Sequence, residues 1–130
     1  MSWQAVVDDN LMDRGLASAA IFHVDGNLLA ASQSFSYKSE EITVILQGFE
    51  NPAAIKGNGF SLGGTQYSIL MAETDVVIGK KGTQGICIKK TINALIIIGI
   101  CDKPMEIGRC AAIVEEIADA LVYANRVIDD

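Results

Sequence analysis

The stretch that most constrains the fold runs from residue 59 to residue 101. It holds four short apolar runs, separated roughly every ten residues by turns rich in glycine, acidic residues or lysine. This spacing predicts consecutive strands of an antiparallel sheet, at Tyr67–Glu73, Val76–Lys81, Ile86–Lys90 and Ala94–Cys101. The last run is apolar on both faces, which predicts a central strand covered from both sides.

Helical patterns lie at both ends of the chain. Ser2 is a good N-cap and Gly15 a good stop signal, which predicts a helix over residues 3–13. After Pro104 the apolar residues recur at intervals of three and four, which predicts a long amphipathic helix reaching Ile128. Each helix needs a sheet face for its apolar stripe, and we expect both helices on the same face.

Two further elements are expected between the N-terminal helix and residue 59. Asp25-Gly26-Asn27 separates apolar runs over residues 19–24 and 28–32, which predicts a hairpin. A helix is expected from Ser39 as its cap, with acidic residues in its first turn, to Asn51-Pro52. Strands thus outnumber helices and come in consecutive runs, so the predicted class is α+β, built on a central antiparallel sheet of about six to seven strands. With 130 residues, a single domain over 1–130 is the expected organisation.

Composition excludes several classes of function. A net charge of −6 and a pI near 4.6 oppose nucleic-acid binding. Neither a signal peptide nor a transmembrane segment is visible, and three cysteines without metal-ligand spacing fit a reducing cytosol. The only histidine, His23, lies in an apolar strand pattern without a nucleophile or metal cluster around it. We therefore expect neither an enzyme nor a protein with a cofactor or a metal ion.

A basic segment interrupts this acidic chain. Residues 76–92 contain no acidic side chain, and Lys80-Lys81 and Lys89-Lys90 flank a turn at residues 82–85. In a hairpin we expect the four ammonium groups to crowd onto one part of one surface and to bind an anionic partner. The alternative is a solvated edge whose lysines discourage strand pairing.

Six short motifs occur in an order that resembles profilin, an actin-monomer-binding family, over roughly residues 2–123. The motifs are Ser2-Trp3-Gln4-Ala5 with Asp8, Asp25-Gly26-Asn27, Asn58-Gly59-Phe60 with Gly63-Gly64, Gly79-Lys80-Lys81-Gly82, Ile88-Lys89-Lys90-Thr91, and Val114-Glu115 to Ala118-Asp119-Ala120-Leu121.

This resemblance implies a cytoplasmic, cytoskeleton-associated regulator without catalytic activity. Its expected partners are monomeric actin, whose nucleotide exchange it would promote, proline-rich proteins such as formin-type nucleators, and phosphoinositide headgroups. It also implies short helices on the second face of the sheet. The actin site carried over by position consists of Phe60, Gln66, Met71, Lys80, Lys81, Gly108 and Arg109. Gln66 and Met71 depart from the family, which often has basic residues there.

The resemblance also implies a shelf for proline-rich ligands between the two terminal helices. Its expected residues are Trp3, Val6, Leu29, Ala120, Leu121 and Tyr123, and those of the phosphoinositide site are Lys80, Lys81, Lys89 and Lys90. Val6, Leu29 and Ala120 stand where the family commonly has aromatic rings, and Tyr123 can restore one ring. We expect weakened binding, because such a shelf relies on flat rings and hydrogen-bond donors.

Two alternatives stay open at this stage. The first is a lipid-binding or protein-binding adaptor on the same scaffold that binds proline-rich ligands little. The second is a PAS-like sensor of small ligands, which would need an internal pocket of several hundred cubic ångströms, on the order of known ligand sites.

Overall fold

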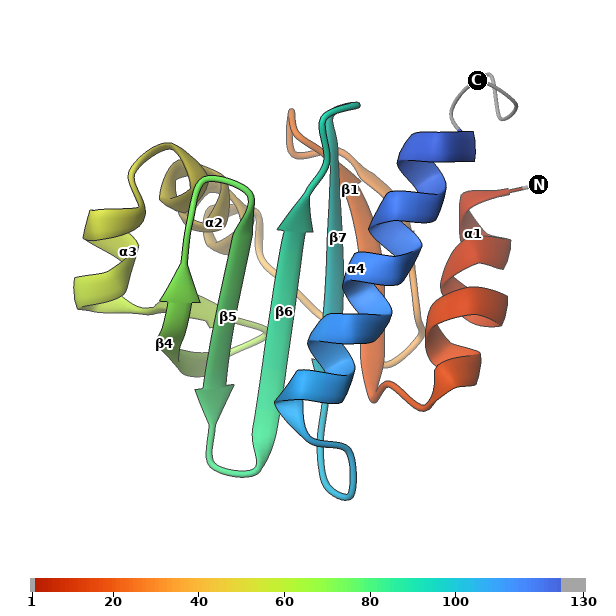
Figure 1. Cartoon of the computed structure of the whole chain (residues 1–130). Coiled ribbons are helices and arrows are strands. Elements are labelled where there is room, and N and C mark those ends of the chain that lie inside the picture. Colours follow the sequence, from red (N-terminus) through yellow and green to blue (C-terminus); the bar gives the residue numbers. More distant parts are fainter. Residues whose placement is uncertain (1, 125–130) are drawn as a thin grey trace.

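The computed structural model describes residues 2–124, so the predicted end of the last helix at Ile128 lies outside the described residues. Its framework is one seven-stranded sheet in the order β2-β1-β7-β6-β5-β4-β3, in which all neighbours are antiparallel (Figure 1). The predicted α+β class with an antiparallel sheet is confirmed. The strands are β1 Ser18–His23, β2 Leu28–Ala31, β3 Phe60–Leu62, β4 Thr65–Ala72, β5 Val76–Lys81, β6 Gln84–Lys90 and β7 Leu95–Cys101.

Helical segments occupy both ends of the described chain and the stretch between β2 and β3. The first segment winds without a break through α1, η1 and η2, changing from α to π to 3₁₀ turns, and we call these three elements together the N-terminal helix. Ser2 caps it by accepting a 3.0 Å hydrogen bond from the Ala5 amide, and Gly15 ends it with a φ of 101°. The bounds are α1 Trp3–Ala5, η1 Val6–Leu11, η2 Met12–Arg14, α2 Ser39–Glu50, α3 Pro52–Asn58 and α4 Ile107–Ala124.

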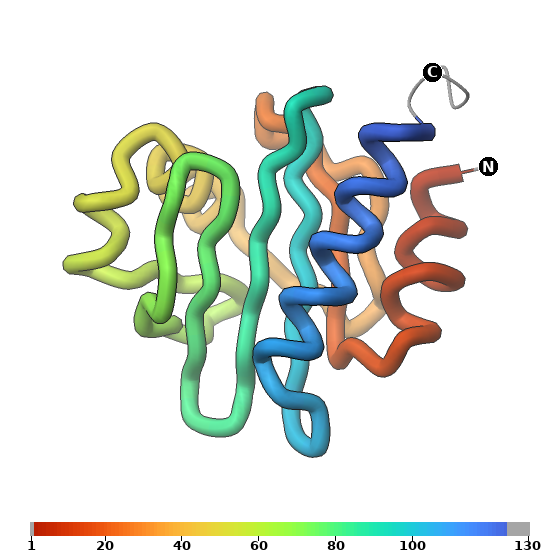
Figure 2. Tube along the Cα trace, in the orientation of Figure 1, coloured from red at the N-terminus to blue at the C-terminus, as the bar shows by residue number. Residues whose placement is uncertain are grey.

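The helices cover the two faces of the sheet as two separate groups. The helix α4 packs over β6 and β7, and the N-terminal helix lies beside it against β1 and β2. The helices α2 and α3 pack near β3 and β4 on the other face (Figure 1). The first turn of the N-terminal helix and the last turn of α4 lie side by side at one end of the molecule (Figure 2). The prediction that both terminal helices share a face is confirmed.

The central strand β7 has the two-sided apolar character that its sequence predicts. Leu95 and Ile97 belong to the core beneath α4, whereas Ile96 and Ile98 belong to the core beneath α2 and α3. This alternation follows from the two-residue period of a strand. At Gly99 the helix comes so close that a Cβ atom would lie 2.5 Å from Cγ2 of Val114.

Three local features differ from the prediction. Pro52, expected to end or interrupt the helix from Ser39, also starts α3, because proline is well suited to the first turn of a helix. Lys38 rather than Ser39 is the N-cap of α2. Ala94 precedes β7 in the left-handed region, with a φ of 69°, and so stands outside the strand predicted to begin there. Among residues 2–124, no helix has the length and apolar character needed to cross a membrane.

Candidate functional site

One part of the sheet lies open beside α4. The strands β4 and β5 continue the sheet past α4 on the same side, and Figure 1 shows no helix over them there. A bulge between Ile69 and Met71 interrupts the pairing of β4 with β5, and Leu70 and Met71 are both exposed at it. We call the open area the β4–β5 patch, formed by Ser68, Leu70, Met71, Ile78 and Lys80.

A hollow of about 340 Å³ adjoins this patch, between the β5–β6 turn and the start of α4. Lys80 and Lys103 both line it, together with the exposed side chain of Leu70. The hollow therefore combines two ammonium groups with apolar surface. Its full lining is Leu70, Lys80, Gly82, Thr83, Gln84, Gly85, Lys103, Met105, Glu106 and Ile107.

Asp102 holds the loop before α4 against the β5–β6 turn. Its carboxylate accepts hydrogen bonds from the side chain of Thr83 and, at 2.8 Å, from the backbone amide of Lys103. These bonds lower the pKa of Asp102, the Thr83 contact contributing most. The position of Lys103 opposite Lys80 thus follows from a defined contact. Sequence reasoning did not select Lys103, because it lies outside the basic segment.

The structure brings most of the residues expected at the actin site to this side of the molecule. Met71 and Lys80 belong to the patch, and Gln66 lies farther along the same face of β4. Gly108 and Arg109 are exposed in the first turn of α4, whereas the exposed Lys81 follows Lys80 on the opposite face of β5. Arg109, however, lines a different hollow of about 410 Å³, next to Gly15, Ala17, Asp102, Lys103, Pro104 and Met105.

Phe60 does not belong to this surface, which corrects the expectation. Its side chain is 2% exposed and stacks on Tyr67, with ring centroids 5.4 Å apart. Phe60 and Tyr67 face each other across the β3–β4 ladder, so both point into the core beneath α2 and α3. A partner on the open side cannot reach Phe60.

The prediction that four lysines crowd together is wrong. Lys80 pairs with Gly85, whereas Lys89 lies four residues farther along β6 and pairs with Val76. At about 3.3 Å per residue, Lys80 and Lys89 are therefore roughly 13 Å apart along the hairpin. Successive side chains of a strand point to opposite faces, so Lys81 and Lys90 lie on the other side. The hairpin distributes its charges over both faces and both ends.

Lys89 is also neutralised locally. Its Nζ lies 2.9 Å from Oδ2 of Asp75, and its side chain is mostly buried. The hydrogen bond that Lys89 donates to Asp75 and the charges of Asp75, Glu115 and Asp119 raise the pKa of Lys89 against the opposing effect of burial. A second anion would meet these carboxylates, so Lys89 is poorly placed to hold a phosphate.

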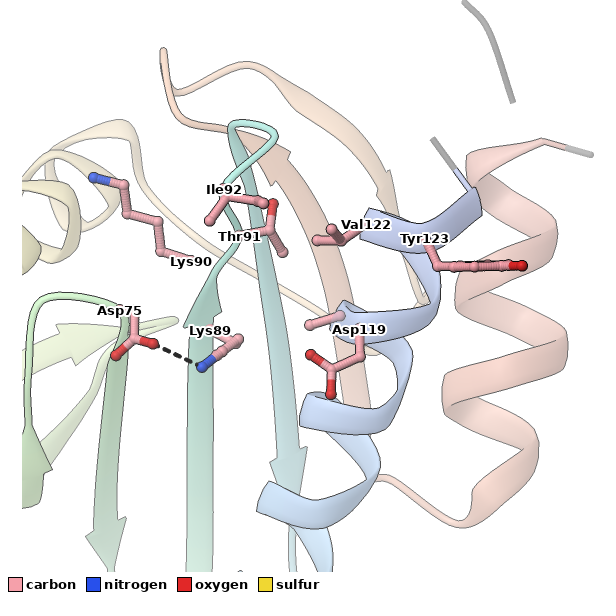
Figure 3. Close-up of a pocket in the computed structure, with 9 residues that line it drawn as sticks. Asp75, Lys89, Lys90, Thr91, Ile92, Asp119, Val122 and Tyr123 are labelled. Atoms are coloured by element: carbon pink, nitrogen blue, oxygen red, sulfur yellow. Dashed lines mark hydrogen bonds and ion pairs between the residues drawn. The ribbon is translucent and has the colours of Figure 1, made fainter. Parts of the chain in front are cut away.

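The terminal helices form a second candidate surface between them, which we call the shelf. Trp3 is half-buried at the start of the N-terminal helix, and Leu29 on β2 packs against the same core. Ala120 is exposed, and Tyr123, 85% exposed, directs its ring toward the N-terminal helix (Figure 3). Two aromatic rings thus border the place where the helices meet.

Val6 and Leu121 lie beneath the shelf rather than on it. They are 3% and 5% exposed, respectively, and both belong to the core under α4. They were expected to line the ligand surface, but their apolar side chains hold the two helices together instead. The spacing of apolar residues in a terminal helix does not distinguish a residue that lines a ligand surface from one that packs between helices, because the position of the partner helix determines which apolar stripe is covered.

Polar contacts fix the shelf at its edges. Gln4 donates from Nε2 to the backbone carbonyl of Ala31 at 2.9 Å. At the other end of the N-terminal helix, Arg14 Nη1 lies 2.7 Å from Oε2 of Glu116 on α4. The hydrogen bond and charge of Arg14 lower the pKa of Glu116. The two helices that border the shelf are thus linked independently of any ligand.

Two features of the structure were missed from the sequence. One is a groove of about 540 Å³ between the β6–β7 turn and the last turns of α4, beside the highly exposed Ile92. The only sign of this groove in the sequence is an isoleucine, Ile92, at a position expected to be a turn. The other is the buried carboxylate of Glu41, which accepts hydrogen bonds from the amides of Gly63 and Gly64. Its signal is an acidic residue at the third position of a helix, with a Gly-Gly turn farther along the chain.

Comparisons with known proteins agree with this architecture. The profilin family model matches residues 1–126. Acanthamoeba castellanii profilin II is 37% identical with a TM-score of 0.89, over 95% of this chain and 99% of that chain. Schizosaccharomyces pombe profilin is 34% identical with a TM-score of 0.89, over 95% and 98%. LokiProfilin2, solved in complex with rabbit actin, is 19% identical with a TM-score of 0.75 over 92% and 94%, a likeness that shows the fold alone.

The family match extends over nearly the whole chain, and the motifs that suggested it lie where the fold uses them. Ser2 caps the N-terminal helix, and Gly63 and Gly64 form the turn between β3 and β4. Because the profilin family model covers nearly the whole chain, the alternative of a PAS-like sensor is rejected. The chain belongs to the profilin family.

Proposed function

We propose that this profilin binds monomeric actin through the β4–β5 patch and the adjoining hollow, as a cytoskeleton-associated protein of the cytoplasm. The observation that carries the proposal is the open sheet surface on which exposed Leu70 and Met71 lie beside Lys80. A central apolar area with charge at its rim is typical of protein interfaces. The complex of LokiProfilin2 with rabbit actin supports actin as the partner.

The proposed role includes delivery of actin monomers and faster nucleotide exchange on them. Exposed lysines beside an apolar patch raise the rate of association with an acidic partner such as actin. Because Gln66 and Met71 carry no charge, this steering rests on Lys80 and Lys103 at the hollow.

The test is a matched pair of charge reversals. Lys80→Glu should weaken actin binding about fivefold or more at low salt, mainly through slower association, and the effect should shrink as salt rises. Lys56→Glu makes the same charge change on exposed α3, on the other face of the sheet, and should have little effect. Association is followed by stopped flow, and nucleotide exchange with a fluorescent nucleotide bound to actin. Equal effects of both variants would remove the patch from the proposal.

We also propose that the shelf binds proline-rich ligands, formin-type nucleators among them, with reduced affinity. The supporting observation is that Trp3 and Tyr123 offer rings at adjacent ends of the two terminal helices. Aromatic rings with polar tips suit a polyproline II helix, because they pack on its rings and donate to its carbonyls.

Calorimetric titration with a proline-run peptide tests this second proposal. Trp3→Ala should abolish binding of the peptide while leaving actin binding unchanged. Tyr123→Ala should weaken peptide binding, whereas Tyr37→Ala, which alters an exposed tyrosine before α2, should not. If the wild type binds actin but not the peptide, the chain acts as a protein-binding adaptor on the profilin scaffold, and the shelf proposal fails.

Phosphoinositide binding remains a narrower proposal, centred on Lys80, with Lys81 next to it on the opposite face of β5 at the β5–β6 turn. Lys89 is paired with Asp75, and Lys90 lies at the far end of the hairpin. Because Lys80 lines the hollow, a headgroup there would compete with actin. Vesicles that contain phosphoinositide should displace actin from the wild type and not from Lys80→Glu with Lys81→Glu, assayed at protein concentrations that restore actin binding. Equal displacement from both would refute this placement.

A further inference from the structure

The groove at the end of the β6–β7 turn exposes more apolar surface than the fold needs. Ile92 is 93% exposed and Tyr123 85%, the two highest values among the large hydrophobic side chains of residues 2–124. Both line one groove, Ile92 from the β6–β7 turn and Tyr123 from α4, which also contributes Ala118 and Val122. Figure 3 shows Ile92 on one side of the groove and Val122 on the other. We call this the Ile92 groove. Neither Ile92 nor Tyr123 contributes much to the core, so their exposure at the border of one groove indicates a ligand surface.

The lining of the Ile92 groove holds two acidic and two basic residues, but the charges near Lys89, on the side of α4, are predominantly negative. The ammonium group of Lys89 is paired with the carboxylate of Asp75, and Asp119 points across the groove from α4 (Figure 3). Glu115, one helical turn before Asp119, also acts on Lys89. Lys90 also lines the groove, but its side chain extends away from α4 (Figure 3). On the side of α4, the ammonium group of Lys89 thus lies near three carboxylates, of which Asp75 and Asp119 line the groove, and this local excess of negative charge favours a cationic group in the ligand.

The groove and the shelf meet at Tyr123. The ring of Tyr123 is directed toward the N-terminal helix, while the same residue lines the groove on the other side of α4. A ligand that crosses the shelf and passes Tyr123 therefore enters the groove without leaving the protein surface. The two surfaces can hold successive segments of one extended chain.

We propose that the Ile92 groove binds the segment that flanks the proline run of the shelf ligand, and that it selects an aliphatic residue followed by lysine or arginine. The aliphatic side chain packs between Ile92 and Val122, and the cationic group lies against Asp119. This inference rests on the proposed binding of proline-rich ligands by the shelf. It adds a subsite that sets which proline-rich partners are preferred.

Calorimetry with five peptides tests the inference on the full chain. One peptide is a bare proline run, and the others carry Leu-Arg or Leu-Glu at the first or the last proline. Leu-Arg at one of the two ends should tighten binding roughly tenfold over the bare run, since one aliphatic side chain is buried and one ion pair forms. Leu-Glu at the same end should give a clearly smaller gain.

Three variants test whether the gain in affinity from Leu-Arg arises in the Ile92 groove. Ile92→Ser should remove it and leave the affinity for the bare run unchanged. Asp119→Lys should reverse the preference, so that Leu-Glu binds better than Leu-Arg. Both residues are exposed, so neither change disturbs the core. Val44→Ser, which alters an exposed aliphatic side chain on α2, is the matched control and should change nothing.

The outcomes separate the subsite from the function on which it rests. If the wild type does not bind the bare run, the shelf proposal itself fails. If it binds all five peptides equally, the shelf stands and the groove inference is overturned. A dimer that Ile92→Ser dissociates in sedimentation velocity would assign the groove to a second copy. If Leu-Arg raises the peptide affinity only in the variant Arg126→Ser, the groove is assigned to the chain's own C-terminal segment, which competes with the peptide in the wild type. Either of the last two results also overturns the inference.

Discussion

Replacing Glu41 by glutamine should destabilise this protein far more than its place on a helix suggests. Glu41 is the third residue of α2, and its carboxylate is buried. Oε1 accepts from the amides of Lys38 at 2.8 Å and Gly63 at 2.9 Å. Oε2 accepts from Oγ of Ser61 at 3.0 Å and from the amide of Gly64 at 3.2 Å. One side chain thus fastens the start of α2 to the β3–β4 turn.

The magnitude follows from those four bonds. Glutamine keeps one oxygen and replaces the other by an NH2 group that cannot accept, so the bonds from Lys38 and Gly63 are lost if Oε1 is replaced, and the bond from Gly64 if Oε2 is replaced, because the hydroxyl of Ser61 can then accept instead of donate. In either orientation the remaining bonds lose their charged acceptor. A hydrogen bond to a charged group contributes about 1.5–3 kcal/mol. Because Gly63 and Gly64 are exposed and water can solvate their amides, we expect a loss of about 2–4 kcal/mol in the free energy of unfolding.

Urea unfolding followed by circular dichroism measures this loss, and Glu40→Gln is the control. Glu40 lies in the same first turn but is exposed, so its replacement removes only the favourable interaction with the helix dipole, about 0.5 kcal/mol. The slope of the free energy against urea should not change. If Glu41→Gln lowers the free energy of unfolding no more than Glu40→Gln does, the hydrogen bonds of Glu41 do not hold α2 to the β3–β4 turn in the proposed way.

The pH dependence supplies a second check on the same variant. Burial alone would raise the pKa of Glu41, but the hydrogen bonds from Gly63, Lys38, Gly64 and Ser61 together outweigh burial and lower it from its ordinary value of 4.5. A lowered pKa in the folded state means that the stabilisation is fully present above pH 4.5 and is lost as the pH falls through the folded pKa. The difference between wild type and Glu41→Gln should therefore be constant near neutral pH and shrink below pH 4.5.

Two further predictions concern the packing of α4. Gly99→Ala would bring a methyl group 2.5 Å from Cγ2 of the fully buried Val114, so it should cost about 1–3 kcal/mol in urea unfolding. Gly108→Ala meets no atom within 4 Å and should be neutral or slightly stabilising; an equal loss for both variants would contradict this packing. The thiols of Cys87 and Cys110 should resist a thiol reagent in the folded protein and react after unfolding, because burial raises the pKa of Cys87 to about 12 and that of Cys110 still further. Reaction of either thiol at the rate of an exposed cysteine would show that this core opens readily.

Much of the fold could be predicted because its signals are local. The Asp25-Gly26 turn, the N-cap at Ser2 and the stop at Gly15 each depend on a few neighbouring residues, and all three lie where expected. The two-sided apolar pattern of β7 likewise reports its central position directly. The residue pattern alone did not place α3, although the resemblance to profilin implied short helices on that face, since Pro52 suits both the end of one helix and the start of another.

The site was harder to predict, because side-chain direction depends on register and on distant partners. Lys80 and Lys89 are close in sequence, yet the pairing of β5 with β6 places them at opposite ends of the hairpin. Phe60 is aromatic and follows a glycine turn, but the β3–β4 pairing turns it into the core beneath α2. Lys103 joins Lys80 only because Asp102 binds Thr83. Each of these facts requires the assembled sheet.

The helix α4 connects the two proposed binding surfaces while keeping them apart. Its first turn borders the hollow at Lys80 and Lys103, and its last turn carries Tyr123 at the shelf and the groove. The helix is 18 residues long, which is about 27 Å at 1.5 Å per residue. Charges separated by that distance are screened at physiological salt, where the Debye length is about 8 Å. A charge change at one end therefore leaves the electrostatics of the other intact, and one molecule can hold an actin monomer and a proline-rich ligand together unless the ligands themselves collide.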